Sequence, residues 1–435
     1  MRRQLLRRGA VLLVVVPLAV LAASSTGSGA TRSTSAVSGS ISFDGVWTGA
    51  EASAFGGVIK AYNKLYPKVK VNYKPVGDNL PTVVSTAVAG GNPPDMADIA
   101  QPGLVAQFVK KGALKPITYS RKVLLANFSP AWIALGTFSH KIYGLVFKAS
   151  NKSTVWYNVP AFKAAGVKAP ATWTQFTKNA GTIKSSGVPP YSIGGADGWT
   201  LTDLFENIYL RQAGPAKYAL LTLHKIKWTD ASVTSALNTM AQVIGDSANM
   251  AGGTSGAVQT DFPTSVNNVW ESPPKAAIVL EGDFVPGVAT VKSKPGTGYA
   301  EFPFPSINNS PASVEIGGDT IVAFRDNPAI ESFVKFLGTP AAAAAWAAKG
   351  GFATGNKHMS TSVYPDATTR ATAGAIAKAK YVAFDMSDQQ PASFGATVGQ
   401  GEWGLFQDFL RNPKDVKSIQ SKLESAAAAA WKSGK

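Results

Sequence analysis

The chain has 435 residues, of which 45% are hydrophobic and 10% aromatic, and this is enough apolar material to form the cores of two α/β lobes. Its formal charge of +16 is dispersed along the sequence, without a basic stripe interleaved with aromatic residues, which argues against a nucleic-acid-binding protein. The sequence contains no cysteine, which excludes disulfide bonds, thiol catalysis and cysteine metal sites.

The N-terminus has the composition of an export signal. Four arginines lie within the first eight residues and precede an uncharged apolar run over residues 10–23, which is too short to predict a membrane-spanning helix. Small residues predict cleavage after Ala30, so residues 1–30 are interpreted as a signal peptide and residues 31–40 as a flexible tether. General and twin-arginine export both remain open. We expect an extracytoplasmic protein that is secreted, or held at the cell surface without a lipidated cysteine.

Residues 41–103 predict a unit of strand, helix, strand, helix and strand. Apolar residues recur at helical spacing from Phe55 to Leu65, and apolar and charged residues alternate over 69–74 as in a half-buried strand. This order predicts a parallel sheet, in which ligands bind beyond the carboxyl ends of the strands. An aromatic plane with polar neighbours suits a sugar, whose faces are apolar and whose rim carries hydroxyls. The side chains at these strand ends are Trp47, Glu51, Asp78 and Gln101.

The later segments continue the α/β pattern. Two β-rich runs, 142–147 and 153–157, flank a break at 148–152, and residues 172–175 have the pattern of a capping box at a helix start. Trp199 begins an amphipathic helix, and residues 314–324 predict a strand that is interrupted at 317–319. Trp156 and Trp346 are expected to pack in the core, whereas Trp47 fits either core packing or sugar stacking.

A set of short motifs runs in order through nearly the whole mature chain. They are residues 46–51, 90–95, 101–103, 143–145, 152–153, 155–158, 172–173, 198–199, 252–253, 317–319, 350–352 and 384–388. In this order they resemble the extracellular solute-binding proteins of family 1, which serve carbohydrate ABC importers, and within that family the alpha-glucoside-binding branch.

The resemblance implies an α/β, two-lobed periplasmic-binding-protein fold of the maltose-binding (type II) kind, with a ligand cleft between the lobes. Residues 41–148 and 320–365 would form lobe one, residues 149–319 and 366–435 would form lobe two, and the chain would cross between them three times. It also implies a substrate-binding subunit that captures an alpha-glucoside or short oligosaccharide. The expected partners are permease transmembrane subunits with a separate ATPase, and the protein is expected to be a monomer.

The resemblance places further ligand-binding residues in this cleft. Trp199, Phe284 and Phe352 would stack on sugar faces, while charged and amide groups would bind hydroxyls. No catalytic residue, metal ligand or cofactor is expected. Together with the four strand-end residues, the predicted ligand-binding residues are Lys148, Asn151, Trp199, Asp203, Glu281, Asp283, Phe284, Asp319, Phe352, Asp385 and Asp388.

Two other functions stay open at this level. A glycosidase would use paired carboxylates, either Asp385 with Asp388 or Glu281 with Asp283. The three histidines lie far apart without metal-ligand spacing, and no nucleophile or phosphate-loop motif is present. A sugar sensor or adhesin would keep the fold and change its role.

Overall fold

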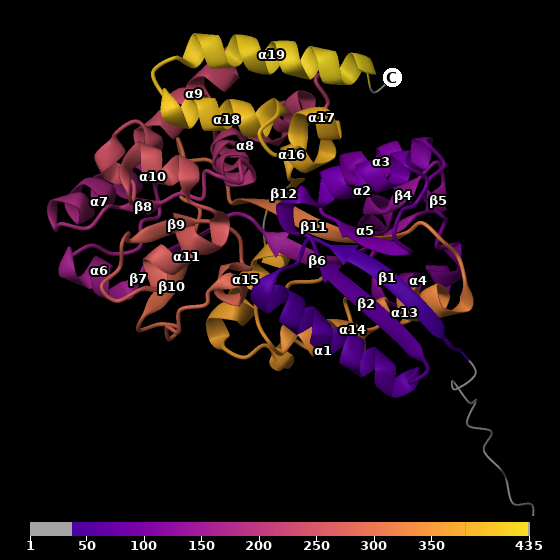
Figure 1. Ribbon diagram of the computed structural model, residues 1–435. Coiled ribbons are helices and arrows are strands. Elements are labelled where there is room, and N and C mark those ends of the chain that lie inside the picture. Colours follow the sequence, from indigo (N-terminus) through magenta and orange to yellow (C-terminus); the bar gives the residue numbers. More distant parts are fainter. Residues whose placement is uncertain (1–36, 379, 434–435) are drawn as a thin grey trace, which may run out of the picture.

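The computed structural model describes residues 37–378 and 380–433, which form two lobes joined by extended strands (Figure 1). The predicted signal peptide and most of the predicted tether lie outside the described residues. The first strand, β1 (Gly39–Gly45), begins two residues earlier than expected, so residues 39 and 40 belong to the sheet and not to the tether.

The first lobe is built on a six-stranded sheet. Its order is β12–β11–β3–β1–β2, and β6 also pairs with β11. β1 pairs in parallel with β2 and β3, which confirms the parallel arrangement expected for the N-terminal unit. The elements of this lobe besides β1 are α1 (Gly49–Leu65), β2 (Val69–Pro75), α2 (Leu80–Ala89), β3 (Met96–Ile99), α3 (Pro102–Lys110), α4 (Arg121–Asn127), α5 (Pro130–Leu135), β4 (Thr137–Phe138), β5 (Lys141–Ile142), β6 (Gly144–Asn151), β11 (Ser313–Ala323), α13 (Pro328–Leu337), α14 (Pro340–Ala347) and β12 (Tyr381–Phe384).

The second lobe is built on a four-stranded sheet of order β10–β7–β9–β8. The capping prediction is confirmed at α7, where the Thr172 hydroxyl accepts a hydrogen bond from the backbone N–H of Gln175 at 3.3 Å. The elements of this lobe are β7 (Thr154–Asn158), α6 (Val159–Ala164), α7 (Trp173–Ser185), β8 (Tyr191–Ser192), α8 (Trp199–Thr222), α9 (Ala231–Ile244), α10 (Gly253–Gln259), α11 (Phe262–Trp270), β9 (Ile278–Leu280), α12 (Val285–Val288), β10 (Tyr299–Pro303), α16 (Met386–Gln389), α17 (Ala392–Gly395), α18 (Gly401–Arg411) and α19 (Val416–Ser433).

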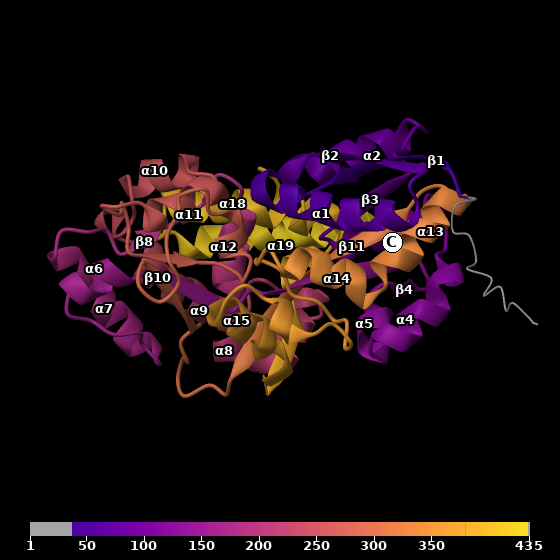
Figure 2. The same cartoon turned by 90° about the horizontal axis from the view of Figure 1, so that it is seen from below.

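Each lobe has its own hydrophobic core. One cluster joins β1, α1, β6, α13 and α14, with Phe55 and Trp346 fully buried in it. A second cluster joins α7, α8, α9, α18 and α19, and its buried residues come only from segments of the second lobe. The helix α15 (Ala367–Lys378) lies between the lobes in both views (Figures 1 and 2). Among the described residues, no helix combines the length and apolar character needed to cross a membrane.

The structure corrects two expectations about the segments that join the lobes. β6 continues through residues 148–151, so the predicted break between two β-rich runs is itself strand, and only residues 152 and 153 separate β6 from β7. β11 is likewise continuous through 317–319, with a register shift between Asp319 and Thr320 in its pairing with β6. The predicted lobe boundaries at 148/149 and 319/320 therefore fall inside two strands that pair with each other.

The glycines that suggested an interruption of β11 are explained by close approach. A Cβ atom at Gly317 would lie 2.8 Å from the Cε of Lys152, and a Cβ atom at Gly318 would lie 2.7 Å from the Cγ1 of Val146. Cβ atoms essentially never make contacts this short, so a side chain at either position would require its neighbour to move. The two glycines therefore let the Lys152 side chain and β6 pass close to β11 without breaking the strand.

Candidate ligand-binding site

A cavity of about 230 Å³ lies between the lobes. The first lobe supplies the start of α1, the turn before α2, the start of α3 and one face of β6 and β11. The second lobe supplies the starts of α8 and α11, with α12, α16 and α18. The residues that line it are Val46, Trp47, Thr48, Gly49, Ala50, Glu51, Gly77, Asp78, Leu80, Pro81, Ala100, Gln101, Lys148, Ser150, Lys152, Trp199, Phe262, Pro263, Phe284, Val288, Thr290, Gly317, Gly318, Asp319, Asp388 and Trp403.

The wall from the first lobe carries a linked group of charges. The Lys148 ammonium donates to Glu51 Oε1 at 2.7 Å and lies 3.5 Å from Asp319 Oδ2. Burial lowers the pKa of Lys148, but Glu51 and Asp319 raise it more, so the net shift is upward and Lys148 stays charged. Glu51 lies in the first turn of α1, where the helix dipole also favours a negative charge. This wall therefore offers donors and acceptors whose positions are fixed by their own ion pairs.

Trp47 belongs mainly to the core of the first lobe. It is 1% exposed, its ring centroid lies 4.7 Å from that of Trp346 and 4.8 Å from that of Phe55, and its indole N–H donates to Asp319 Oδ2 at 2.6 Å. The ring thus holds Asp319 in place at the cavity wall. A role of Trp47 in stacking on a sugar stays a prediction.

The wall from the second lobe carries four aromatic side chains, and besides Trp403 they are Trp199, Phe262 and Phe284. Trp199 and Phe262 make an edge-to-face contact with centroids 4.9 Å apart, and Phe284 lies 5.5 Å from Phe262. The indole N–H of Trp199 donates to Asp78 Oδ2 at 3.3 Å, and the Lys148 ammonium lies 5.0 Å from the centroid of the Phe284 ring. Since Asp78 and Lys148 belong to the first lobe, these contacts join the two walls.

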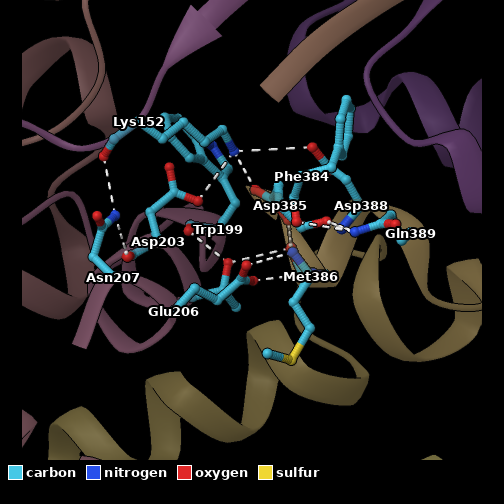
Figure 3. A network of polar contacts seen from close by, with 12 residues as sticks. Lys152, Trp199, Asp203, Glu206, Asn207, Phe384, Asp385, Met386, Asp388 and Gln389 are labelled. Atoms are coloured by element: carbon cyan, nitrogen blue, oxygen red, sulfur yellow. Dashed lines mark hydrogen bonds and ion pairs between the residues drawn. The ribbon is translucent and has the colours of Figure 1, made fainter. Parts of the chain in front are cut away.

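Beneath the cavity, the Lys152 ammonium is surrounded by carboxylates (Figure 3). It forms an ion pair with Asp385, donates to Asp203 Oδ1 at 3.0 Å, lies 3.9 Å from Asp388 Oδ2, and lies 5.6 Å from the centroid of the Trp199 ring. Asp385 also caps α16, where it accepts from the backbone N–H of Asp388 at 2.8 Å. Lys152 therefore links the connection between β6 and β7 to α8 and to α16.

A second carboxylate, Glu206, also accepts hydrogen bonds from the start of α16 (Figure 3). Glu206 is fully buried on α8, accepts from the backbone N–H of Met386, and accepts from the N–H of Ser387 at 3.0 Å. Hydrogen bonds from two backbone donors compensate for part of the cost of burying this carboxyl. The network thus ties α16, which carries the cavity residue Asp388, to the core of the second lobe.

The buried carboxyls make the stability of the fold depend on pH. Burial raises the pKa of Asp203, of Asp197 and of Asp283 to about 7 in each case. When the folded-state pKa of an acid exceeds its unfolded value, the folded state binds the extra proton, so this contribution to stability grows as the pH falls through the folded pKa. We expect the free energy of unfolding to rise from pH 8 to pH 6, by up to about 1.4 kcal/mol per pH unit for each proton taken up.

Chemical denaturation at several pH values measures this dependence. Asp283→Asn, which removes one of these carboxyls, should reduce the slope, whereas replacing the exposed Asp246 should leave it unchanged. A free energy of unfolding that is flat or falls from pH 8 to pH 6 would contradict the prediction.

The structure separates the predicted site residues into two groups. Nine line the cavity, and six do not. Phe352 is buried against Trp346, with ring centroids 5.2 Å apart, and Asp203 and Asp385 lie beneath the wall as partners of Lys152. The nine that line the cavity are Trp47, Glu51, Asp78, Gln101, Lys148, Trp199, Phe284, Asp319 and Asp388; the other six are Asn151, Asp203, Glu281, Asp283, Phe352 and Asp385. For all of them, contact with a ligand stays a prediction.

Asn151 lies on the wrong face of its strand for the cavity. Lys148, Ser150 and Lys152 line the cavity, whereas Asn151 and Ser153 line a different hollow on the opposite face. Successive side chains of a strand point to opposite faces, and from 148 to 153 the cavity residues have even numbers whereas Asn151 and Ser153 have odd ones. The interpretation of 148–152 as a break obscures this alternation. The alternation is the sequence pattern that predicts Ser150 and Lys152 on the same face as Lys148.

Other lining residues were also missed. Phe262 begins α11, and the preceding Asp261 caps that helix by accepting from the N–H of Thr264 at 2.8 Å. A capping aspartate followed by an aromatic residue and a proline is readable in the sequence. Trp403, on α18, had no such signal, because nothing local shows that its helix reaches the cleft.

Neither of the two predicted carboxylate pairs has the arrangement of a glycosidase. Asp385 is 0% exposed and neutralised by Lys152, and Glu281 and Asp283 are buried away from the cavity wall. Two carboxyls that flank a scissile bond would both have to face the substrate. Three carboxylates, Asp203, Glu315 and Asp385, lie close enough together to suit a cation, and Lys152 already provides an ammonium to two of them.

Two α/β lobes, each with its own sheet, and a cavity walled by aromatic and charged side chains from both define a two-lobed solute-binding protein. The family described as bacterial extracellular solute-binding protein matches residues 47–344, and the chain belongs to this family. It is therefore an exported protein. Both the expected family and the expected fold are confirmed.

Individual relatives support the same class. The osmoprotective compounds-binding protein GgtB of Synechocystis is 29% identical over 351 residues, which cover 79% of this chain and 82% of that protein. The alpha-glucosides-binding periplasmic protein AglE of Rhizobium meliloti is 29% identical over 367 residues, which cover 81% and 80%. The solved structure of the bacterial solute receptor AcbH superposes with a TM-score of 0.79 at 20% identity, covering 92% of this chain and 100% of that one. The structure of RafE in complex with raffinose gives 0.72 at 17% identity, covering 90% and 100%.

Proposed function

We propose that this chain is the sugar-binding subunit of an ABC importer and that it captures an alpha-glucoside or a similarly small saccharide between its lobes. The observation that carries this proposal is the composition of the cavity wall. Trp199, Phe262 and Phe284 offer apolar planes, while Glu51, Lys148 and other charged groups provide acceptors and donors fixed by their own ion pairs. Aromatic planes match the C–H faces of a pyranose and the polar groups match its hydroxyls.

The size of the cavity favours a short ligand. Its volume of about 230 Å³ is below the range of roughly 300–1,000 Å³ that is typical of sites for drug-sized ligands. A monosaccharide or disaccharide therefore suits it better than a longer oligosaccharide. The alpha-glucoside preference is supported by the relative that is named for these sugars.

Binding would be coupled to closure of the lobes. A ligand that contacts residues of both walls, such as Trp199 and Glu51, does so only when the lobes approach each other, as they do here, where the indole of Trp199 donates to Asp78 across the cavity. A ligand with contacts that exist only in the closed form shifts the population toward it. The closed form would then deliver the sugar to permease transmembrane subunits that are driven by a separate ATPase.

No reaction is part of this proposal. Asp388 is the only member of the two carboxylate pairs that reaches the cavity wall, and Lys152 lies 3.9 Å from it. The bound sugar should therefore be released unchanged.

Thermal unfolding of the mature chain against a panel of sugars tests the proposal. We expect one or a few small saccharides, with maltose and trehalose among the first tried, to raise the unfolding midpoint. A sugar at a thousand times its dissociation constant adds about 4 kcal/mol to the free energy of unfolding. Chromatography of the recovered sugars should show no products. If no saccharide shifts the midpoint, or if the bound one is consumed, the proposal is wrong.

A further inference from the structure

A second and larger hollow lies on the other face of the strands that join the lobes. Its volume is about 660 Å³, against about 230 Å³ for the cavity between the lobes. Asn151 and Ser153 line it, and these residues alternate along the chain with the cavity residues Ser150 and Lys152. The two spaces therefore lie on opposite faces of the same segment, and one ligand cannot fill both.

The walls of this rear cavity are mostly apolar. They come from the turn before α7, from the connection between β10 and β11, and from α15, which supplies Ala371, Thr372 and Ala375. The lining also includes the rings of Phe302, Phe304 and Pro311, and the connection contributes Ser306 and Ser310. A ligand that fits these walls needs a flat apolar body.

Arg211 is the one cationic side chain among the described residues that line the rear cavity. It is 7% exposed, and its guanidinium lies 4.6 Å from the centroid of the Phe304 ring. Nη1 donates to the backbone oxygen and to Oδ1 of Asn207, both at 3.0 Å, and Nη2 donates to the backbone oxygen of Ser313 at 2.9 Å. The Nε–H group has no hydrogen-bond partner among the described residues, although a guanidinium carries five donors.

Arg211 also lacks a counter-ion. No carboxylate among the described residues lies within ion-pair distance of it, and burial, opposed by the charge of Glu315, lowers its pKa only to about 10, so it stays charged at neutral pH. Glu301 lines the same cavity on β10 without pairing with Arg211, and burial raises the pKa of its carboxyl. A buried guanidinium that has neutral hydrogen-bond partners but no counter-ion favours an anionic ligand.

We propose that the rear cavity is a second small-molecule site, which takes a flat aromatic or similarly apolar compound carrying one carboxylate. The carboxylate would accept from the free N–H groups of Arg211, and the apolar body would lie against Phe304 and α15. This site is separate from the sugar site and does not depend on the proposed function.

Isothermal titration of the mature chain with 2-naphthoate, and with 2-naphthylmethanol as its uncharged counterpart, tests the site. We expect one molecule of 2-naphthoate to bind at least tenfold more tightly than the alcohol. Ala375→Phe, which fills the rear cavity, should abolish binding, whereas Ala367→Phe, at the exposed start of the same helix and away from the cavity wall, should not. Glu301→Gln should tighten binding because it removes a nearby negative charge.

Trp199→Ala separates the two sites, since it alters the cavity between the lobes and leaves the rear cavity intact. Binding of 2-naphthoate should be unchanged in this variant. The proposal is overturned if 2-naphthoate does not bind, if the alcohol binds equally well, if Ala375→Phe has no effect, or if Trp199→Ala abolishes binding. Circular dichroism and unfolding midpoints confirm that each variant is folded.

Discussion

Replacing Lys152 with methionine should lower the free energy of unfolding by about 3–5 kcal/mol, the usual cost of removing one partner from a buried ion pair. Lys152 is the cation that faces Asp203 and Asp385, and Asp203 and Asp385 are almost fully buried. Methionine keeps most of the length and apolar surface of the side chain, so the loss comes from the charge. Equilibrium denaturation in urea at pH 7.5 measures it.

Two further variants show whether the loss of stability comes from burying carboxylates that have lost their ammonium partner. Lys184 forms an exposed ion pair with Asp246 at 2.6 Å, and Lys184→Met should cost less than about 1 kcal/mol. Adding Asp203→Asn to Lys152→Met should recover part of the lost stability, because one of the unpaired carboxylates is then neutral. If Lys152→Met proves as mild as Lys184→Met, the ammonium does not stabilise the cluster as the structure indicates.

Trp199→Ala should raise the dissociation constant of whichever sugar stabilises the protein by about 30-fold, or about 2 kcal/mol. Trp199 begins α8, lines the cavity, and is held by Phe262 and by its hydrogen bond to Asp78. A fixed, half-buried indole loses little freedom when a sugar covers it, which is why tryptophans dominate many binding sites. Isothermal titration of the variant with that sugar measures the change.

Trp431 provides the matched control. It is also half-buried, but it lies on α19 against His224, with ring centroids 5.0 Å apart, and it is not part of the cavity wall. Trp431→Ala should lower stability and leave the affinity for the sugar unchanged. Equal losses of affinity in the two variants would show that Trp199 acts through the stability of the second lobe and not through the ligand.

Much of the fold was readable because it is encoded locally. The alternation in β2, the helical spacing in α1 and the capping residue Thr172 each specify an element from a few neighbouring residues. The residues at the carboxyl ends of β1 and β3, among them Glu51 and Gln101, lie at the cavity for the same reason, since the topology of a parallel sheet brings strand ends together.

The remaining parts of the site depend on residues that are distant in sequence. Nothing near Phe352 shows that Trp346 covers it, and nothing near Lys152 shows that Asp203 and Asp385 surround its ammonium. The glycines at 317 and 318 suggest a break in a strand from the sequence alone, whereas in the structure they leave space for the side chain of Lys152 and for the strand β6. Such contacts follow from packing across the fold and not from local pattern.

The pairing of β6 with β11 also determines how the protein can deform. The two strands hydrogen-bond from Ile316 opposite Asn151 to Val322 opposite Gly144, and the ladder changes register only between Asp319 and Thr320. A bulge adds local twist and bend to a pair of strands. We therefore expect the pair to bend most easily at this register shift. The ladder resists stretching and sliding, which leaves bending as the soft direction. Under the proposed closure, a ligand would bend this ribbon at one place while the hydrogen bonds of the ladder stay in place.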